Sequence, residues 1–408
     1  MTSTNSPLTT KIFNTVVIVA ALGYFVDIYD LILFSIVRVK SLKDIGIADA
    51  NLKDSGIFLI QMQMIGMLLG GIVWGILGDK KGRLSVLFFT ILLYSLANLA
   101  NGFVQTYQQY AILRVIAGFG LAGELGIGIT LVSEIMTKES RGWGTSLVSG
   151  IGIVGAALAY AFAEWGWRQA YWAGGVLGLL LLFLRIYVHE SPFFARTKSE
   201  GVPRGAFLTF FTSRERFLKY LYCILIGVPV WYTIGILITF SKEFAEALGI
   251  NGQINTGRGV MIHYMGAAIG SILTGWISQI KQSRKKALFF SLTFLTLVTI
   301  AFFLSHGLDL FFFYILIFLL GVAQGYWAIF VTVAAEQFGT NLRSTATTTI
   351  PNFVRGAVVP LTSLWAFWGH SMGILQSAII IAAITLILAF FALYHMRETF
   401  GKELDYHD

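Results

Sequence analysis

Twelve mostly apolar stretches, each long enough to cross a lipid bilayer as a helix, follow one another along the chain. At about 20 residues a crossing they use about 240 of the 408 residues, which leaves no room for a large soluble domain. Charged residues make up 12% of the chain, so much of its apolar surface must face lipid. We expect an all-α membrane protein with helices at about 13–37, 55–77, 84–103, 108–134, 142–163, 167–188, 217–241, 258–279, 286–305, 309–334, 345–369 and 372–394.

Lysine and arginine residues in the loops predict the orientation of the chain. With a cytoplasmic N-terminus, most of the 29 Lys and Arg residues fall in cytoplasmic loops, as the positive-inside rule requires. The exceptions include Arg38, Lys40, Lys43 and Lys53, which we place in the first outer loop. We therefore expect a multi-pass protein of the bacterial inner membrane with both termini in the cytoplasm.

The distribution of basic residues and cysteine excludes other classes of protein. The net charge is +8, but the basic residues are scattered between apolar stretches, which excludes a nucleic-acid partner. Cys223 is the only cysteine, which excludes an internal disulfide and a cysteine metal cluster. The expected partners are the lipid bilayer and a small-molecule substrate, and we expect a functional monomer.

A repeat with an offset near 200 residues divides the chain into two halves. The motif GILGDKKGR at 75–83 follows the second helix, and GWISQIKQSRKK at 275–286 follows the eighth. EIMTKESRG at 134–142 follows the fourth helix and EQFGTNLRS at 336–344 the tenth, and both place Arg seven positions after Glu. The repeat predicts two pseudo-symmetric six-helix bundles, with a substrate site near the membrane midplane between them.

The longest connection separates the two bundles. We expect an N-terminal six-helix bundle at 1–188, a cytoplasmic linker with a short amphipathic helix at 189–216, and a C-terminal six-helix bundle at 217–408. In the linker, Ser191 can cap a helix that begins at Pro192. Thr212 and Glu215 have the spacing of a capping box before the seventh helix. The alternative is a linker without regular structure.

Several motifs resemble those of a known family. The 75–83 loop resembles the signature G-x-L-x-D-R-x-G-R of the major facilitator superfamily, and 114–118 resembles its fourth-helix motif R-x-x-x-G. The segments 23–30 (GYFVDIYD), 123–126 (GELG) and 190–194 (ESPFF) are similar to motifs of its metabolite:proton symporter, sugar-porter-like branch. This resemblance covers essentially the whole chain. It implies the major facilitator fold and a cavity lined by the first, fourth, seventh and tenth helices.

Two aspartates in the first helix, Asp27 and Asp30, are candidates for proton coupling. They are three residues apart, so they lie on one face of the helix, about 4.5 Å apart along its axis. Two carboxylates at this spacing resist ionising together, so one of them can hold a proton. The alternative is that one aspartate caps a helix end or pairs permanently with an arginine.

Charged residues of the fourth helix are also candidates. We expect Arg114 at the depth of Asp30, where protonation of the aspartate would release the guanidinium to bind an anionic substrate group. The alternative is an arginine that only fixes helix packing. Glu124 lies about 15 Å deeper, so it cannot share this partner. We assign Glu124 to proton coupling as a separate site, and a structural hydrogen bond is the alternative.

The second half offers further candidate substrate contacts. Arg355 lies between Pro351 and Pro360, which bend the eleventh helix and can expose the arginine to the cavity. It is a second anion-binding candidate; otherwise it caps carbonyls freed by the prolines. The other substrate candidates are polar and aromatic residues of the seventh and tenth helices: Trp231, Tyr232, Gln324, Tyr326 and Trp327.

The remaining aromatic residues and one histidine fit an interfacial position. We assign the aromatic belt of the membrane to Trp165, Trp167, Tyr171, Trp172, Trp365 and Trp368. His263 in the eighth helix is either a proton relay or, as we favour, a hydrated residue near the interface.

Charged residues at the cytoplasmic ends of helices are assigned to a gate that closes the inner side. The expected network is Asp79, Arg83, Glu134 and Arg141, with Glu336 and Arg343 as its second-half copy. Glycines of the second and fourth helices, among them Gly66 and Gly118, allow these helices to approach and slide.

Together these features predict a transporter that works by alternating access, and not an enzyme. We expect proton-coupled symport of a small organic anion or zwitterion into the cell, without a metal and with no cofactor besides the coupling proton. Proton-coupled efflux of an amphipathic drug or siderophore and facilitative uniport are alternatives. The fifth helix has glycines but no proline, which favours import over efflux. A transport-dead membrane sensor is disfavoured by the short tail after Tyr394.

Overall fold

The computed structural model describes residues 15–137, 140–185 and 205–403, which are almost entirely helical. The first half contains α1 (Thr15–Asp44), η1 (Asp49–Asn51), α2 (Leu52–Lys81), α3 (Arg83–Asn101), α4 (Tyr107–Leu121), α5 (Glu124–Ile135), α6 (Arg141–Ile153), α7 (Gly155–Trp165) and α8 (Trp167–Arg185). The second half contains η2 (Phe207–Phe211), α10 (Arg214–Tyr232), η3 (Thr233–Ile238), α11 (Ser241–Ala247), α12 (Thr256–Ile280), α13 (Arg284–Phe303), α14 (Leu310–Gln324), α15 (Trp327–Gln337), α16 (Arg343–Gly356), α17 (Val358–Met372) and α18 (Ile374–His395).

Several membrane crossings consist of two shorter helices in succession. α4 leads into α5, α6 into α7, α14 into α15 and α16 into α17, while α10 leads through the π-helix η3 into α11. The predicted all-α fold of twelve crossings in two halves is confirmed. In the part of the chain that the structure describes, ten helices are long and apolar enough to cross a membrane. The other two predicted crossings correspond to α8 and to α16 with α17.

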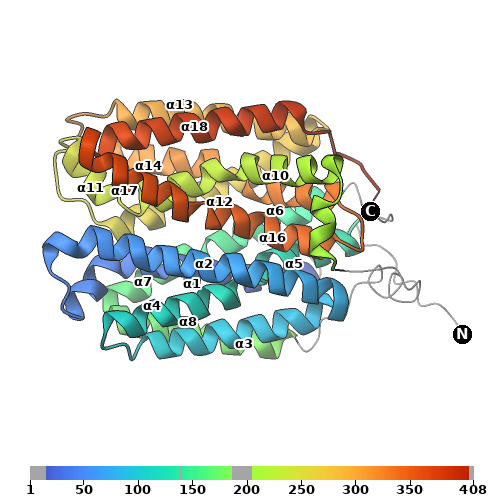
Figure 1. Cartoon of the computed structure of the whole chain (residues 1–408), viewed down its shortest axis with the longest axis horizontal. Coiled ribbons are helices and arrows are strands. Elements are labelled where there is room, and N and C mark those ends of the chain that lie inside the picture. Colours follow the sequence, from blue (N-terminus) through green and yellow to red (C-terminus); the bar gives the residue numbers. More distant parts are fainter. Residues whose placement is uncertain (1–14, 138–139, 186–204, 404–408) are drawn as a thin grey trace, which may run out of the picture.

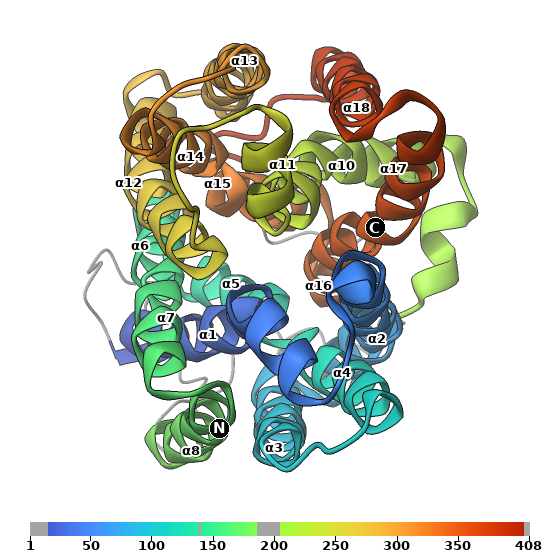
Figure 2. The same ribbon diagram turned by 90° about the vertical axis from the view of Figure 1, so that its left-hand side faces the viewer.

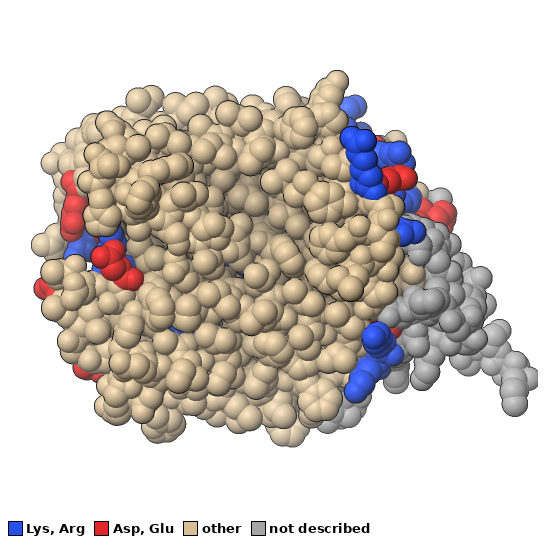
Figure 3. Space-filling view, in the orientation of Figure 1, with Lys and Arg blue, Asp and Glu red and all other residues tan. Residues whose placement is uncertain are grey.

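The two halves lie one above the other in Figure 1 and meet along two seams. α2 packs against α16 at one seam, and α6 and α7 pack against α12 at the other, as the end view in Figure 2 shows. The visible face in Figure 3 is almost free of charged side chains between its two ends, as a membrane-spanning surface must be. We name these ends the Arg38 end, where α1 is followed by α2, and the Asp79 end, where α2 is followed by α3.

The helix breaks follow the internal repeat. α4 ends before Ala122 and α14 before Gly325, and α6 and α16 are interrupted at Val154 and Ala357. Each second-half break therefore lies 203 positions after its first-half counterpart (325 minus 122, and 357 minus 154). The continuous helices predicted at 108–134, 142–163, 309–334 and 345–369 are corrected accordingly, because residues at each break leave the regular hydrogen-bond pattern.

Two predicted helix ends also need correction. α1 continues to Asp44 instead of ending at residue 37, which brings Arg38 into the helix. α10 is capped by Ser213, whose side chain accepts a hydrogen bond from the Arg216 amide, so the predicted Thr212–Glu215 capping box is not the one formed. The linker helix predicted at Pro192 lies outside the described residues.

Small residues bring paired helices into close contact in both halves. A Cβ atom at Gly66 of α2 would overlap the carbonyl oxygen of Val115 in α4. In the second half, a Cβ atom at Gly266 of α12 would overlap the carbonyl oxygen of Phe318 in α14. The repeat thus uses glycine at corresponding positions to pack corresponding helices.

We predict that Gly66→Ala lowers the free energy of unfolding by about 1–3 kcal/mol, because the added methyl group forces α2 away from α4. The thermal unfolding midpoint of the purified protein in detergent measures this loss. Gly128→Ala is the control, since a Cβ atom there meets no heavy atom within 4 Å. An unchanged midpoint for Gly66→Ala would contradict the close packing of α2 and α4.

Candidate functional site

A small cavity lies between the two halves. Its volume is about 30 Å³, which is room for about one water molecule. The residues that line it come from α1, α6, α10, η3, α12, α14, α15 and α16: Tyr24, Ile28, Leu31, Ile153, Val230, Trp231, Ile234, His263, Tyr264, Ala267, Gln324, Trp327 and Arg355. Most of these side chains are apolar or aromatic, so the few polar groups stand out as the ones that could orient a ligand.

An ion pair between the halves borders this cavity. A terminal nitrogen of Arg355 in α16 lies 3.9 Å from a carboxylate oxygen of Asp27 in α1, and both side chains are buried. The guanidinium lies 5.6 Å from the ring centre of Trp231 and 5.7 Å from that of Trp327. Arg355 also donates a hydrogen bond of 3.2 Å to Asn352. The guanidinium is thus held between two aromatic rings and one carboxylate.

Asp30 faces the interior of the first half. It lies against Gly174 of α8 and interacts electrostatically with Asp27 and Arg114. The described side chains give Arg114 hydrogen bonds with Gln63 and Tyr171, not a direct ion pair with Asp30. Arg114 is not among the cavity-lining residues. The structure therefore brings Asp30 and Arg114 near each other but places both away from the cavity wall.

Glu124 occupies a different position. It is the first residue of α5, directly after the break at Ala122 and Gly123, and its side chain is buried. A carboxylate there is favoured by the positive end of the helix dipole. Because the break interrupts the helix, the depth estimated from a continuous helix does not apply. Glu124 is not among the cavity-lining residues.

The predicted substrate contacts of the second half divide into two groups. Trp231, Gln324 and Trp327 line the cavity. The hydroxyl groups of Tyr232 and Tyr326 donate hydrogen bonds of 2.8 and 3.0 Å to the backbone carbonyls of Ala378 and Ile226. These two tyrosines therefore hold neighbouring helices together within the second half.

Sequence reasoning missed several residues of the cavity and its surroundings. Tyr24 and Tyr264 line the cavity, and His263 lines it instead of lying at a hydrated interface. The assignment of Tyr171 to the aromatic belt is wrong, because Tyr171 is buried and hydrogen-bonded to Arg114. Trp365 is also buried, and donates to the Ile374 carbonyl. The one sequence feature that could have indicated this part of the cavity was His263, a lone histidine within an apolar helix.

At the Asp79 end, the predicted gate residues pair across the two halves. Glu134 of α5 accepts a 3.0 Å hydrogen bond from Arg343, the first residue of α16. Asp79 of α2 accepts hydrogen bonds from the backbone amides of Ser344 and Thr345 at the start of the same helix. The helix dipole of α16 favours a carboxylate at this position. The predicted separate network in each half is therefore corrected to contacts between the halves.

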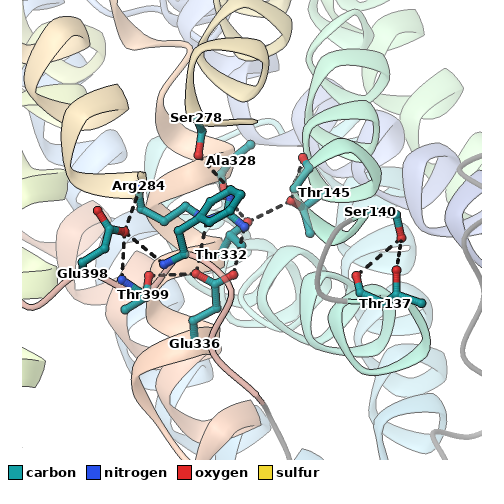
Figure 4. A network of polar contacts seen from close by, with 12 residues as sticks. Thr137, Ser140, Thr145, Ser278, Arg284, Ala328, Thr332, Glu336, Glu398 and Thr399 are labelled. Carbon is teal, nitrogen blue, oxygen red and sulfur yellow. Dashed lines mark hydrogen bonds and ion pairs between the residues drawn. The ribbon is translucent and has the colours of Figure 1, made fainter. Parts of the chain in front are cut away.

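A second set of contacts at this end lies mainly within the second half. Arg284 forms a bidentate pair with Glu336, with N–O distances of 3.0 and 3.2 Å, and Thr399 donates to the same carboxylate (Figure 4). Thr332 connects this region to the first half through Thr145. Arg284 is thus a gate candidate that sequence reasoning missed, although it comes directly after position 283, which corresponds to Arg83 in the repeat.

The C-terminal segment is fixed to this set by Glu398. Burial raises the pKa of the Glu398 carboxyl, but hydrogen bonds from Ser283 and from the amides of Phe400, Arg284 and Thr399 outweigh it and hold the pKa below its usual value. The carboxylate therefore stays charged and caps the start of α13. Arg83 and Arg141 begin α3 and α6, and their side chains lie outside what the structure describes.

A corresponding contact closes the Arg38 end. Arg38 of α1, placed by the sequence in an outer loop, is buried and pairs with Glu243 of α11 at 2.7 Å. Its guanidinium also covers the ring of Phe240 at 4.5 Å. Gln61 of α2 donates to the Thr362 hydroxyl of α17 at 3.0 Å. The small central cavity thus lies between two ends at which the halves are in contact.

We predict that Glu134→Gln opens the Asp79 end, because breaking a buried ion pair costs about 3–5 kcal/mol. A cysteine introduced by Thr347→Cys reports it, since Thr347 is buried 2.6 Å from Thr130 of the other half. Its labelling by a maleimide should become about tenfold faster or more. Glu246→Gln, which removes a solvent-exposed carboxylate, is the control. Unchanged labelling would show that Glu134 does not hold this end closed.

We predict that Glu243→Gln opens the opposite end, because it removes the charge partner of buried Arg38. The reporter is Leu31→Cys, a buried position on the cavity wall. Labelling of this cysteine should rise severalfold, while labelling of the Thr347→Cys reporter should fall, because opening one end favours closure of the other. A rise at both reporters would indicate general loosening and would contradict a specific latch.

Comparison with known proteins identifies a family and several relatives. The sequence model of the Major Facilitator Superfamily matches residues 20–359. A probable 4-methylmuconolactone transporter of Cupriavidus pinatubonensis is 29% identical over 201 residues, 47% of this chain and 46% of that protein, so the match spans about half of this relative. A cis,cis-muconate transport protein of Acinetobacter baylyi is 26% identical over 374 residues, 87% of this chain and 88% of that protein.

A solved structure shares the fold. The chain resembles a proton:xylose symporter of the same superfamily, bound to 6-bromo-6-deoxy-D-glucose, with a TM-score of 0.74. The resemblance covers 96% of this chain and 97% of the symporter at 15% sequence identity.

Proposed function

Because the chain belongs to the Major Facilitator Superfamily and is a multi-pass membrane transporter, we propose that it imports a small organic anion or zwitterion together with protons. The observation that carries this proposal is the Asp27–Arg355 pair, which joins the two halves and whose arginine lines the cavity. A carboxylate and a guanidinium in this position offer a proton site and an anion site that depend on each other.

The coupling follows from competition for Arg355. While Asp27 is charged, it attracts the guanidinium, with 3.9 Å between the nearest nitrogen and oxygen. Protonation of Asp27 removes this attraction and frees Arg355 to bind a substrate carboxylate as a bidentate fork. The sequence assigned this exchange to Asp30 and Arg114. We now assign it to Asp27 and Arg355, because Arg355 lines the cavity and Arg114 does not.

The aromatic walls favour a substrate with a flat or apolar part. Trp231, Trp327, Tyr24 and Tyr264 lie around the cavity, and aromatic rings pack well against unsaturated carbon. Two relatives are named as transporters of cis,cis-muconate and 4-methylmuconolactone. We therefore propose a small carboxylate with an unsaturated or aromatic part as the substrate class.

Alternating access would use the contacts at the two ends in turn. Opening toward the Asp79 end requires the Glu134–Arg343 pair and the Asp79 contacts to break, and opening toward the other end requires the Arg38–Glu243 pair to break. Basic side chains gather at the Asp79 end in Figure 3, so we propose that this end faces the cytoplasm of a bacterial cell. We propose that one chain suffices for transport.

We predict that the protein in liposomes accumulates cis,cis-muconate, or another acid from a panel of small carboxylates, when the interior is made alkaline. Asp27→Asn should reduce this accumulation by about tenfold or more, because the side chain can no longer release its proton. Exchange of internal for external substrate should persist, because the neutral amide leaves Arg355 available.

Asp54→Asn is the matched control, because Asp54 is an exposed aspartate at the start of α2. Accumulation that is unaffected by the pH gradient would indicate uniport and contradict proton coupling. Efflux driven by the gradient would indicate antiport and contradict symport.

A further inference from the structure

His263 of α12 lies in the cavity wall with both ring nitrogens facing oxygen atoms. Nδ1 is 3.3 Å from the backbone carbonyl oxygen of Ile317, and Nε2 is 2.9 Å from Oε1 of Gln324. A neutral imidazole carries one N–H and satisfies one of these oxygens, whereas an imidazolium donates to both. Both oxygens beside His263 can therefore accept hydrogen bonds from an imidazolium.

The orientation of Gln324 is fixed independently of His263. Its amide nitrogen donates a 3.1 Å hydrogen bond to the carbonyl oxygen of Val230 in α10. Turning the amide over would place its oxygen against that carbonyl, so Oε1 must face His263. Gln324 thus holds the imidazole in place, and we no longer assign it a direct contact with substrate.

The first half contains a corresponding arrangement with a permanent charge. Gln63 of α2 donates to the carbonyl oxygen of Leu31 in α1 and accepts a hydrogen bond from Arg114 of α4. Gln63 and His263 lie 200 positions apart, and their carbonyl oxygens face Gly118 and Gly321 respectively. In both halves a glutamine connects a backbone carbonyl, of α1 in the first half and of α10 in the second, to a side chain that contains nitrogen. Only the side chain of the second half, His263, can lose its proton.

We propose that His263 takes up a proton as an anionic substrate enters the cavity, and so acts as a proton-binding group in addition to Asp27. In the substrate-free protein, the shorter Gln324 contact favours the tautomer with hydrogen on Nε2. The added proton then bonds to Nδ1, which donates to the Ile317 carbonyl. The proton comes from the solution to which the cavity is open and leaves with the substrate on the other side.

Electrostatics in the cavity links this proton to the anion. The titratable or charged groups that face the cavity with His263 are Tyr24 from α1, Tyr264 from α12 and Arg355 from α16, with Asp27 beside Arg355. A second cation next to Arg355 is costly in a poorly hydrated cavity. A substrate carboxylate offsets that cost, so proton and anion bind more favourably together than separately.

This inference rests on the proposed function and predicts the number of protons taken up with each anion. Wild-type protein should take up one more proton per bound cis,cis-muconate, or other bound acid of the panel, than His263→Gln. For a gradient of one pH unit, losing one coupled proton lowers the limiting accumulation about tenfold. His306→Gln is the control, because His306 is exposed at a helix end and should leave this number unchanged.

A direct measurement of the protonation state of His263 does not depend on the His263→Gln variant. The nitrogen-15 NMR signals of labelled histidine distinguish imidazole from imidazolium, and the chain has only 6 histidines. The His263 signals can be assigned by elimination with variants of the other five histidines, His189, His306, His370, His395 and His407. A change of His263 from imidazole to imidazolium when the acid binds supports the proposal. An imidazole that stays neutral in the complex overturns it.

The two proposals fail in different ways. If wild-type accumulation follows the pH gradient and Asp27→Asn lowers it about tenfold or more, but His263→Gln takes up as many protons as wild type, then the role of His263 is wrong and symport stands. If His263 becomes charged on binding but no gradient drives accumulation, then symport is wrong and the histidine site stands. If no acid of the panel binds, both proposals are wrong.

Discussion

The cost of placing charged groups inside a membrane protein governs the arrangement of the two halves. Buried charges need partners, and three ion pairs find theirs in the opposite half: Arg38–Glu243 at one end, Asp27–Arg355 in the middle and Glu134–Arg343 at the other end. Separating the halves at any of these levels exposes charges that must be hydrated or paired anew. These contacts between the halves are therefore the ones that a transport cycle must break in order.

The repeat supplies a common scaffold to which each half adds different chemistry. Gly66 and Gly266 pack corresponding helices, and the helix breaks recur 203 positions apart. At the Asp79 end, Asp79 binds the start of α16, while its counterpart Gln279 lies against Gly142 at the start of α6. One seam thus closes with a charged contact and the other with a neutral amide, so the two seams do not resist opening equally.

The sequence was sufficient to predict the twelve crossings and the repeat, because apolar length and repeated motifs can be read from each segment alone. It did not identify partners correctly. Arg114 was expected to meet substrate, yet it faces Gln63 and Tyr171, because the rotation of one helix about its axis depends on its neighbours. Breaks such as the one at Ala122 also change the depth and the direction of the side chains that follow, and helical periodicity does not predict these changes.

The sequence placed its proton-coupling candidates Asp27, Asp30 and Glu124 in the N-terminal half, but the geometry argues for a division between the halves. Asp27 belongs to the first half, and its ion-pair partner Arg355, which lines the cavity, belongs to the second half. His263 is held by Gln324 on that same side. In the proposed mechanism, a proton site in one half and an anion site in the other respond together only while the halves are closed around the cavity. Coupling then follows from closure itself, since a proton or an anion bound alone leaves a charge in the cavity without its partner.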